Sequence, residues 1–184
     1  MHIVPFSPPH AAGVVDVILP IQQAEFGIPV TLADQPDLLD IAGFYQQGGG
    51  GFWVALDEGT VVGTIALLDI GLHDGGHGDG ALRKMFVAAN HRGKEYGTAA
   101  RLLDTLLAHA HTMGMRRIWL GTTDKFLAAH RFYEKHGFEQ VARQDLPAAF
   151  PVMAVDTRFY ARGAAIPATS GTASAASSAM AADT

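Results

Sequence analysis

The spacing of hydrophobic residues changes along this chain. From Ala11 to Phe26, apolar residues recur three and four positions apart, which is the spacing of one face of a helix. Pro20 lies inside this run and is expected to end or kink the helix, because proline lacks a backbone N–H. A second helical stretch covers residues 38–44 and stops before the glycines at 48–51. The N-terminal part of the chain is therefore predicted to be mainly helical.

The pattern then becomes typical of strands. Apolar runs within residues 52–70 are separated by Asp57-Glu58-Gly59, a sequence that favours a hairpin turn. A glycine-rich stretch at 71–80 is predicted to be a flexible connection, and residues 81–88 form a further strand.

The second half of the chain alternates helix and strand. Apolar positions from Gly97 to Met113 follow helical spacing, and a strand is predicted at 116–123. A second helix at 125–136 is followed by Gly137 as its C-terminal cap, and the last strand is predicted at 150–160. The expected fold class is α/β (α+β), with a mixed sheet whose first strands are antiparallel.

Composition sets the number of domains. With 184 residues, 48% of them hydrophobic and 17% charged, the chain has enough apolar surface for one core. From residue 162 onward the sequence consists of small and polar residues without a hydrophobic period. We therefore predict one domain over residues 1–161 and a disordered tail over 162–184.

Charge and cysteine content exclude several classes of function. A net charge of −5 argues against non-specific binding to nucleic acid, whose phosphates attract clustered Lys and Arg. The chain contains 0 cysteines, which excludes disulfides, thiolate metal sites and cysteine nucleophiles. The N-terminal residues do not resemble a secretory signal, and no long uncharged apolar run predicts a membrane span. A cytoplasmic location is expected, with neither nucleic acid nor membrane as a partner.

The stretch "NHRGKEYGTAARLL" at residues 90–103 has the features of an anion site. A turn leads from the preceding strand into a helix, whose free N–H groups and dipole favour a phosphate. Arg92 and Lys94 add positive charge beside the turn. The glycine spacing fits neither the Walker loop nor the dinucleotide fingerprint. A solvated glycine turn without a ligand explains this segment equally well on its own.

A second segment adds information. "RKMFVAANHRGKEYGTAARLLDTLLAHA", followed by "FLAAHRFYEKHGF", resembles the paired signatures of the GNAT superfamily of acyl-CoA N-acyltransferases. Arg92 and Gly97 match the ends of the family's loop pattern [QR]-x-x-G-x-[GA], whereas Glu95 replaces its first glycine. Phe126 stands where many members have Asn. The second signature, A-x-x-x-Y-[ED]-K-x-G-F, is matched by Ala129, Tyr133, Glu134, Lys135, Gly137 and Phe138.

This resemblance implies a fold and a co-substrate. The fold is a GNAT-like mixed sheet with antiparallel N-terminal strands, splayed central strands and flanking helices. The co-substrate is acetyl-CoA, with no metal. The backbone of one central strand is expected to pair with the pantetheine arm, and the turn is expected to hold the pyrophosphate. The implied coenzyme-binding residues are Met85, Phe86, Val87, Arg92, Gly93, Lys94, Glu95, Tyr96, Gly97 and Thr98.

The resemblance also implies catalytic residues. Tyr133 matches the position of the general acid that protonates the departing thiolate, and its alternative role is that of a packing aromatic residue. Glu25 lies, by this resemblance, in a region that flanks the acceptor groove, and it is predicted to be an acceptor-side carboxylate or the base. Asp69 and a water relay remain alternatives for the base. The Glu25 and Asp69 carboxylates are also explained as solvated or helix-capping groups without a catalytic role.

The predicted activity is transfer of an acyl group, with acetyl as the expected one, from acetyl-CoA to a primary amine of a small molecule or peptide. The chain is also expected to form a homodimer. Two alternatives stay open: a non-catalytic acyl-CoA-binding module with the same fold, and a nucleotide-phosphate-binding protein. His73, Asp74, His77 and Asp79 lie close together in the glycine-rich stretch, and a solvated loop is predicted there in preference to a metal site.

Overall fold

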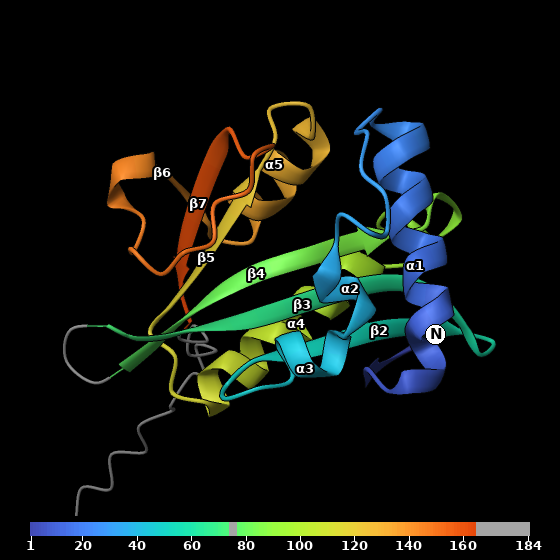
Figure 1. The fold of residues 1–184 in the computed structure, drawn as a ribbon, viewed down its shortest axis with the longest axis horizontal. Coiled ribbons are helices and arrows are strands. Elements are labelled where there is room, and N and C mark those ends of the chain that lie inside the picture. The colour runs from blue at the N-terminus through green and yellow to red at the C-terminus, as the bar shows by residue number, and fades with distance from the viewer. Residues whose placement is uncertain (74–76, 165–184) are drawn as a thin grey trace, which may run out of the picture.

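The computed structural model describes residues 1–73 and 77–164 and shows one mixed sheet with helices on both faces (Figure 1). In this described part the sheet has seven strands in the order β1-β2-β3-β4-β5-β7-β6. Neighbouring strands are antiparallel except β4 and β5, which are parallel. The predicted fold class is therefore confirmed. The strands are β1 (His2–Pro5), β2 (Gly51–Asp57), β3 (Thr60–His73), β4 (His77–Val87), β5 (Arg117–Thr122), β6 (Glu139–Val141) and β7 (Arg158–Gly163).

The β2–β3 hairpin forms at the predicted turn. Asp57 pairs with Thr60, and the two residues between them, Glu58 and Gly59, have φ angles of 48° and 82°. Positive φ at both positions is the conformation that matches the twist of the flanking strands.

The connection that we predicted to be flexible at residues 71–80 is mostly strand. β3 continues to His73 and β4 begins at His77, with Leu72 paired with Gly78. The prediction was wrong here because glycine-rich backbone forms ladder hydrogen bonds without an apolar pattern in its side chains. Residues 74–76 lie outside the described part.

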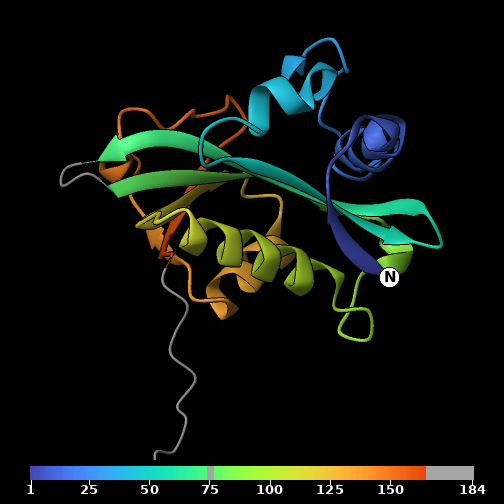
Figure 2. The same cartoon turned by 90° about the horizontal axis from the view of Figure 1, so that it is seen from below.

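Helices cover the two faces of the sheet separately, as Figure 2 shows. One face carries α1, α2 and α3 over a core that includes Val14, Ile18 and Tyr45. The other face carries α4 and α5 over a core that includes Leu102 and Leu106. The α-helices are α1 (Ala11–Pro20), α2 (Pro36–Leu39), α3 (Ile41–Tyr45), α4 (Thr98–Thr112) and α5 (Leu127–Lys135), and the other helical segments are η1 (Pro8–His10), η2 (Ile21–Glu25), η3 (Ala89–His91) and η4 (Arg143–Asp145).

The first helix changes its hydrogen-bonding pattern at the proline. Regular α-helix ends at Pro20, and the π-helical segment η2 continues the chain to Glu25. The expected effect of Pro20 is confirmed, since proline cannot donate the hydrogen bond that an α-helix needs there.

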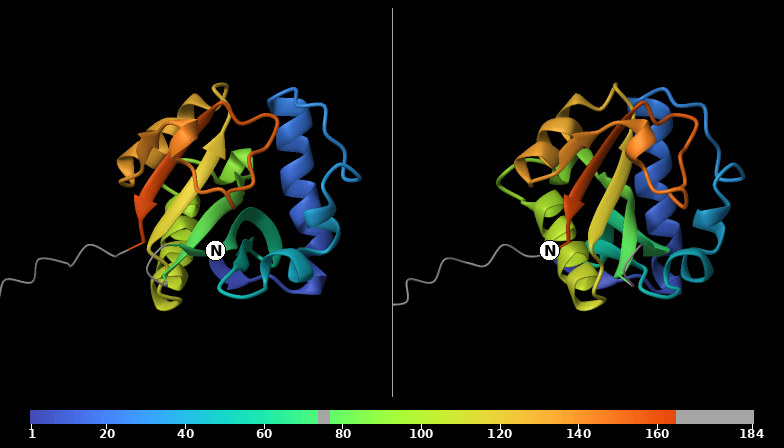
Figure 3. Two further views of the ribbon diagram at one scale, coloured as in Figure 1. Left: turned by 60° about the vertical axis from the view of Figure 1, so that its left-hand side comes forward. Right: turned by 90° about the vertical axis from the view of Figure 1, so that its left-hand side faces the viewer.

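The two central strands separate along their length. β4 and β5 pair only at Asp79–Arg117, Gly80–Ile118 and Ala81–Trp119, after which the strands diverge (Figure 3). β4 then contains a β-bulge. Arg83 pairs with Ala66 and Phe86 pairs with Thr64, so two residues of β4 lie opposite one residue of β3. The predicted splay of the central strands is confirmed.

The C-terminal part differs from the sequence prediction. Residues 150–157 form a loop, and only from Arg158 does β7 begin. β7 runs to Gly163, and the Ala164 N–H donates a hydrogen bond to the Arg116 carbonyl. The domain boundary that we predicted at residue 161 therefore falls inside a strand, and at least residues 162–164 belong to the fold. The predicted disorder of the remaining tail concerns residues outside the described part.

Candidate active site

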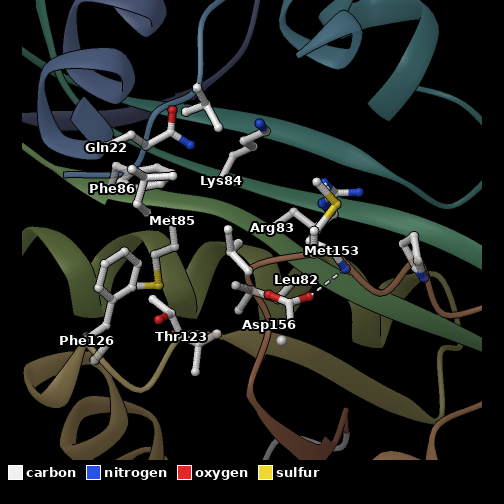
Figure 4. Close-up of a pocket in the computed structure, with 18 of the residues that line it drawn as sticks. Gln22, Leu82, Arg83, Lys84, Met85, Phe86, Thr123, Phe126, Met153 and Asp156 are labelled. Carbon is white, nitrogen blue, oxygen red and sulfur yellow. Dashed lines mark hydrogen bonds between the residues drawn. The ribbon is translucent and has the colours of Figure 1, made fainter. Parts of the chain in front are cut away.

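A cavity of about 270 Å³ lies where β4 and β5 separate (Figure 4). Three parts of the chain line it: the segment after α1, the two splayed strands with α5, and the loop before β7. Figure 4 shows Asp156, Met153 and Arg83 together at one end, and Met85 with Phe126 at the other. The cavity therefore joins an apolar end to a charged end.

Tyr133 on α5 lines this cavity and is 7% exposed. Its hydroxyl lies 3.6 Å from the Met85 sulfur on β4. Burial raises the pKa of the phenol far above its usual range, so Tyr133 remains protonated. Its ring also packs edge-on against Phe138. Tyr133 thus combines a buried aromatic ring with a proton held beside the strand that is expected to bind the coenzyme.

The predicted anion turn lies between η3 and α4. Gly97 adopts a left-handed φ of 61° and is the N-cap of α4, where no side chain caps the helix within the described residues. The Thr98 hydroxyl donates 2.9 Å to the His91 carbonyl, which folds the turn back on itself. Among residues 1–73 and 77–164, no side chain caps the first N–H groups of α4. Free N–H groups at a helix N-terminus are the arrangement that binds phosphate.

Arg92 connects this turn to two other elements. Its Nε donates 2.7 Å to the Val87 carbonyl at the end of β4. Its two terminal nitrogens donate 2.8 and 2.9 Å to the Glu25 carboxylate at the end of η2. Glu25 is thus placed beside the anion turn, and it is not among the residues that line the cavity. Its role as a base stays a prediction.

The other predicted turn residues are exposed. Lys94 extends into solvent, and the Tyr96 ring lies 5.5 Å from the His91 ring. The Glu95 carboxylate lies close over Gly93: a Cβ added at Gly93 would be 2.6 Å from the Glu95 Oε2. A negative charge therefore stands beside the turn that is expected to hold a pyrophosphate.

The coenzyme-binding residues predicted on β4 lie in its splayed part. Met85 and Phe86 line the cavity, and Val87 is buried beneath the turn. This stretch of β4 lies beyond the last β4–β5 pair, at Ala81. The edge of its backbone that faces β5 is therefore open. An extended ligand can hydrogen-bond to such an edge as an additional strand would.

A polar cluster on one wall of the cavity was not predicted from the sequence. The Lys84 amine lies 3.1 Å from the Asp37 carboxylate and donates 2.5 Å to the Gln35 side chain. The Tyr45 hydroxyl donates 2.6 Å to the same Asp37 carboxylate. Burial lowers the pKa of Lys84, and Asp37 opposes this shift. No local pattern signals this cluster, since its members come from α2 and the residue before it, from α3 and from β4.

Two more charged residues were missed, and they line the charged end of the cavity. The Asp156 Oδ2 accepts a hydrogen bond of 2.9 Å from the Met153 N–H. Desolvation raises the pKa of Asp156, and the Met153 N–H, Arg83 and Arg143 oppose that shift. The Arg83 guanidinium donates to the Met153 sulfur at 3.1 Å. Within residues 1–73 and 77–164, no carboxylate lies within ion-pair distance of Arg83.

The remaining sequence candidates have other positions. Asp69 accepts hydrogen bonds of 2.8 and 2.9 Å from the Gly49 and Gly71 N–H groups and does not line the cavity. Asp79 is buried and accepts 2.9 Å from the Trp119 indole N–H. The side chains of His73, Asp74 and His77 lie outside the described part, and no metal-binding cluster occurs among the residues described.

Comparison with known proteins matches residues 16–138 to the family model named Acetyltransferase (GNAT) family. N-acetylaspartate synthetase of Xenopus tropicalis is 41% identical over 108 residues, which are 57% of this chain and 37% of that protein. The uncharacterized N-acetyltransferase YjgM of Escherichia coli K12 is 34% identical over 123 residues, 64% of this chain and 70% of that protein. This chain thus spans well under half of the first of these relatives.

Solved structures show the same fold over a longer stretch. A GNAT-family acetyltransferase from Staphylococcus aureus MU50 superposes with a TM-score of 0.81 and 36% identity, covering 89% of this chain and 99% of that one. An acetyltransferase from Streptococcus agalactiae 2603 has the same TM-score and 32% identity, with 88% and 97% coverage. Among the described residues, no helix has the length and hydrophobicity needed to cross a bilayer.

Proposed function

Because the chain belongs to the GNAT acetyltransferase family, we propose that it transfers an acyl group, acetyl above all, from acetyl-CoA to a primary amine of a small molecule or peptide. One arrangement carries this proposal: the splayed edge of β4 and the protonated Tyr133 line the same cavity, and β4 leads on to the open helix N-terminus after Gly97. Relatives named N-acetyltransferases and N-acetylaspartate synthetase support an amine acceptor.

The three parts of this arrangement have separate tasks. The N–H groups of the turn, with Arg92 and Lys94, bind the pyrophosphate. The backbone of Met85 to Val87 pairs with the pantetheine arm, which directs the thioester toward the cavity. A neutral amine then attacks the thioester carbonyl, and Tyr133 protonates the thiolate as the C–S bond breaks.

The coenzyme is a co-substrate, and the reaction as proposed needs no metal. Glu25 remains one proposed base, and Asp156 is a second carboxylate that, unlike Glu25, lines the cavity. A cytoplasmic location and a homodimer belong to the same proposal, and neither follows from the geometry of the site.

Release of free thiol from acetyl-CoA on addition of primary amines tests the activity directly. We expect thiol release that depends on both the enzyme and the amine. Calorimetric titration with coenzyme A and, separately, with ATP distinguishes the alternatives. Binding of coenzyme A without thiol release on any amine would favour the non-catalytic module, for which Glu95 beside the turn is the specific supporting observation. Binding of ATP in preference to coenzyme A would favour the nucleotide-phosphate-binding protein.

A further inference from the structure

The charged end of the cavity contains one cationic and one anionic side chain that are not paired with each other. Arg83 and Asp156 both line it, yet neither takes part in a salt bridge within the described residues. They are close enough for Arg83 to lower the pKa of Asp156. By contrast, Lys84 in the same wall is neutralised by Asp37 at 3.1 Å. A ligand that neutralises both groups must carry a negative and a positive charge.

We propose that the acceptor is an amino acid: its carboxylate binds to the Arg83 guanidinium, and its ammonium group binds to Asp156, which removes a proton before the attack. This inference rests on the proposed function and adds the class of acceptor and the identity of the base.

The β-bulge on β4 explains how Arg83 reaches this position. Without a bulge, adjacent strand residues point to opposite faces, so Arg83 and Lys84 would be separated by the sheet. Lys84 instead has a φ of 50°, and Lys84 and Met85 together lie opposite Ile65. Both cationic side chains consequently line the cavity, one paired and one open.

Arg83 suits a carboxylate for chemical reasons. A guanidinium has five N–H donors in a planar fork that fits the two oxygens of a carboxylate. Its one hydrogen bond to a described residue goes to the Met153 sulfur, which is a weak acceptor. Most of its donors thus remain available to a ligand in the cavity.

Asp156 is held by the backbone around it. The Met153 N–H binds Oδ2, and the carboxylate lies directly over Gly121 of β5, where a Cβ would overlap it. Gly121 lies in the part of β5 that has separated from β4. The carboxylate is therefore fixed over the open part of β5.

The proton and electron balance of the step is complete. An ammonium N–H bond breaks and the proton passes to Asp156, which frees the nitrogen lone pair. The nitrogen attacks the thioester carbonyl carbon, the C–S bond breaks, and the thiolate receives the Tyr133 proton. The second proton on the attacking nitrogen then passes to the Tyr133 phenolate, which leaves a neutral amide and restores the phenol. Burial raises the pKa of Asp156, which makes it a stronger base than an exposed aspartate. The charged groups that face it are Arg83 from β4 and Arg143 from η4.

Thiol release measured with L-amino acids and with the matching amino acid amides tests the carboxylate site, because the amide of each pair lacks that negative charge. We expect kcat/KM to be at least about tenfold higher for the acids, in the range of a charge-assisted hydrogen bond. Arg83→Gln should remove that preference by lowering activity on the acids alone. Arg131→Gln, on the exposed face of α5, is the matched control and should keep it.

Equal activity on acids and amides in the wild type would overturn the amino acid proposal and leave acetyl transfer to amines intact. An equal loss on both in Arg83→Gln would also overturn it. Absence of thiol release with every amine would overturn this inference and the proposed function together.

The pH profile tests the base. Wild-type kcat/KM should rise with pH on the acidic limb of its profile as Asp156 ionises. In Asp156→Asn this limb should be absent, and turnover should fall about 10²-fold. Asp156→Glu should restore part of the rate with a shifted limb, which a purely structural aspartate would not produce. Coenzyme A affinity should be unchanged in both variants. An intact acidic limb and near wild-type turnover in Asp156→Asn would remove Asp156 from the reaction.

Discussion

The Arg92 guanidinium donates two hydrogen bonds, of 2.8 and 2.9 Å, to the Glu25 carboxylate and so connects the anion turn to the end of η2. Both side chains are partly exposed, at 41% and 35%. A phosphate that approaches the turn therefore meets an arginine whose charge is already shared. From this pair we infer a role for Glu25 in coenzyme binding, separate from its predicted role as a base.

Glu25→Gln distinguishes the two roles of Glu25. Because the carboxylate lies at the turn and outside the lining of the cavity, we expect coenzyme A affinity to change by about two- to tenfold, in the range of a partly exposed ion pair. The pH profile of turnover should keep its acidic limb. Calorimetry and a pH series on the same variant make the measurement. Loss of the limb would instead establish Glu25 as the base.

Tyr133→Phe tests the general acid. The substitution keeps the buried ring and removes only the hydroxyl, which lies near the Met85 sulfur. Turnover should fall about 10²-fold, the usual size of a general-acid contribution, with coenzyme A affinity nearly unchanged.

Tyr160→Phe is the matched control for Tyr133→Phe. Tyr160 is fully buried, and its hydroxyl donates 3.1 Å to Glu134, but it does not line the cavity. This variant should lose about 1 kcal/mol of stability, as for one hydrogen bond, and keep its turnover. If Tyr133→Phe behaved in the same way, Tyr133 would be a packing residue only.

Much of the fold follows from local patterns in the sequence. The helix at Thr98–Thr112 and the hairpin turn at Glu58-Gly59 were predicted because periodicity and turn chemistry act within a few residues. β1 and β6 were missed because they have only four and three residues. Their pairing partners also lie far along the chain: Ile3, for example, pairs with Ala55.

The residues of the turn could be singled out from the sequence, whereas the charged end of the cavity could not. The turn is one continuous segment, so its glycines and cations are visible together in the sequence. Asp156 lies in a run that looked like a strand, and its proximity to Arg83 depends on the bulge in β4 and the loop before β7. Such tertiary placement leaves no periodic signal. The Glu25–Arg92 pair joins residues 67 positions apart and was missed for the same reason.

Glu95→Gly restores the glycine of the family loop pattern and removes a negative charge beside the turn. In the wild type the carboxylate lies over Gly93, where it would repel the pyrophosphate of the proposed coenzyme. Coenzyme A affinity should therefore rise about three- to tenfold, and the gain should shrink at high salt. Glu139→Gln on the exposed strand β6 is the charge control and should have no effect. Weaker binding in Glu95→Gly would show that this carboxylate helps to shape the turn.

The effect of Asp156→Asn on stability should depend on pH. Burial raises the folded-state pKa of Asp156, so the fold favours its neutral form. That stabilisation is complete below the unfolded pKa of about 3.9 and is lost as pH rises through the folded pKa. The neutral asparagine avoids this loss, so Tm should exceed that of the wild type at neutral pH and the difference should shrink in acid.

Asp34→Asn should show the opposite trend. Thr31 donates hydrogen bonds of 2.8 and 2.6 Å to the Asp34 carboxylate and lowers its pKa. The resulting stability is present above the unfolded pKa and is lost as pH falls through the folded one. Thermal melts of both variants across the acid range make the comparison, and parallel trends would contradict the assigned direction for Asp156.

Gly121→Ala tests whether the position of the Asp156 carboxylate matters, without altering that carboxylate. The added Cβ would overlap Asp156 Oδ2, so the side chain must move away from β5. Gly121 does not have a left-handed φ, and alanine therefore fits its backbone without strain. Turnover should fall about tenfold or more, since small displacements of a catalytic group are costly, while coenzyme A affinity stays the same. Gly163→Ala, a strand glycine of β7 whose Cβ would meet open space, should leave turnover unchanged. Full turnover in Gly121→Ala would mean that the reaction does not depend on where Asp156 lies.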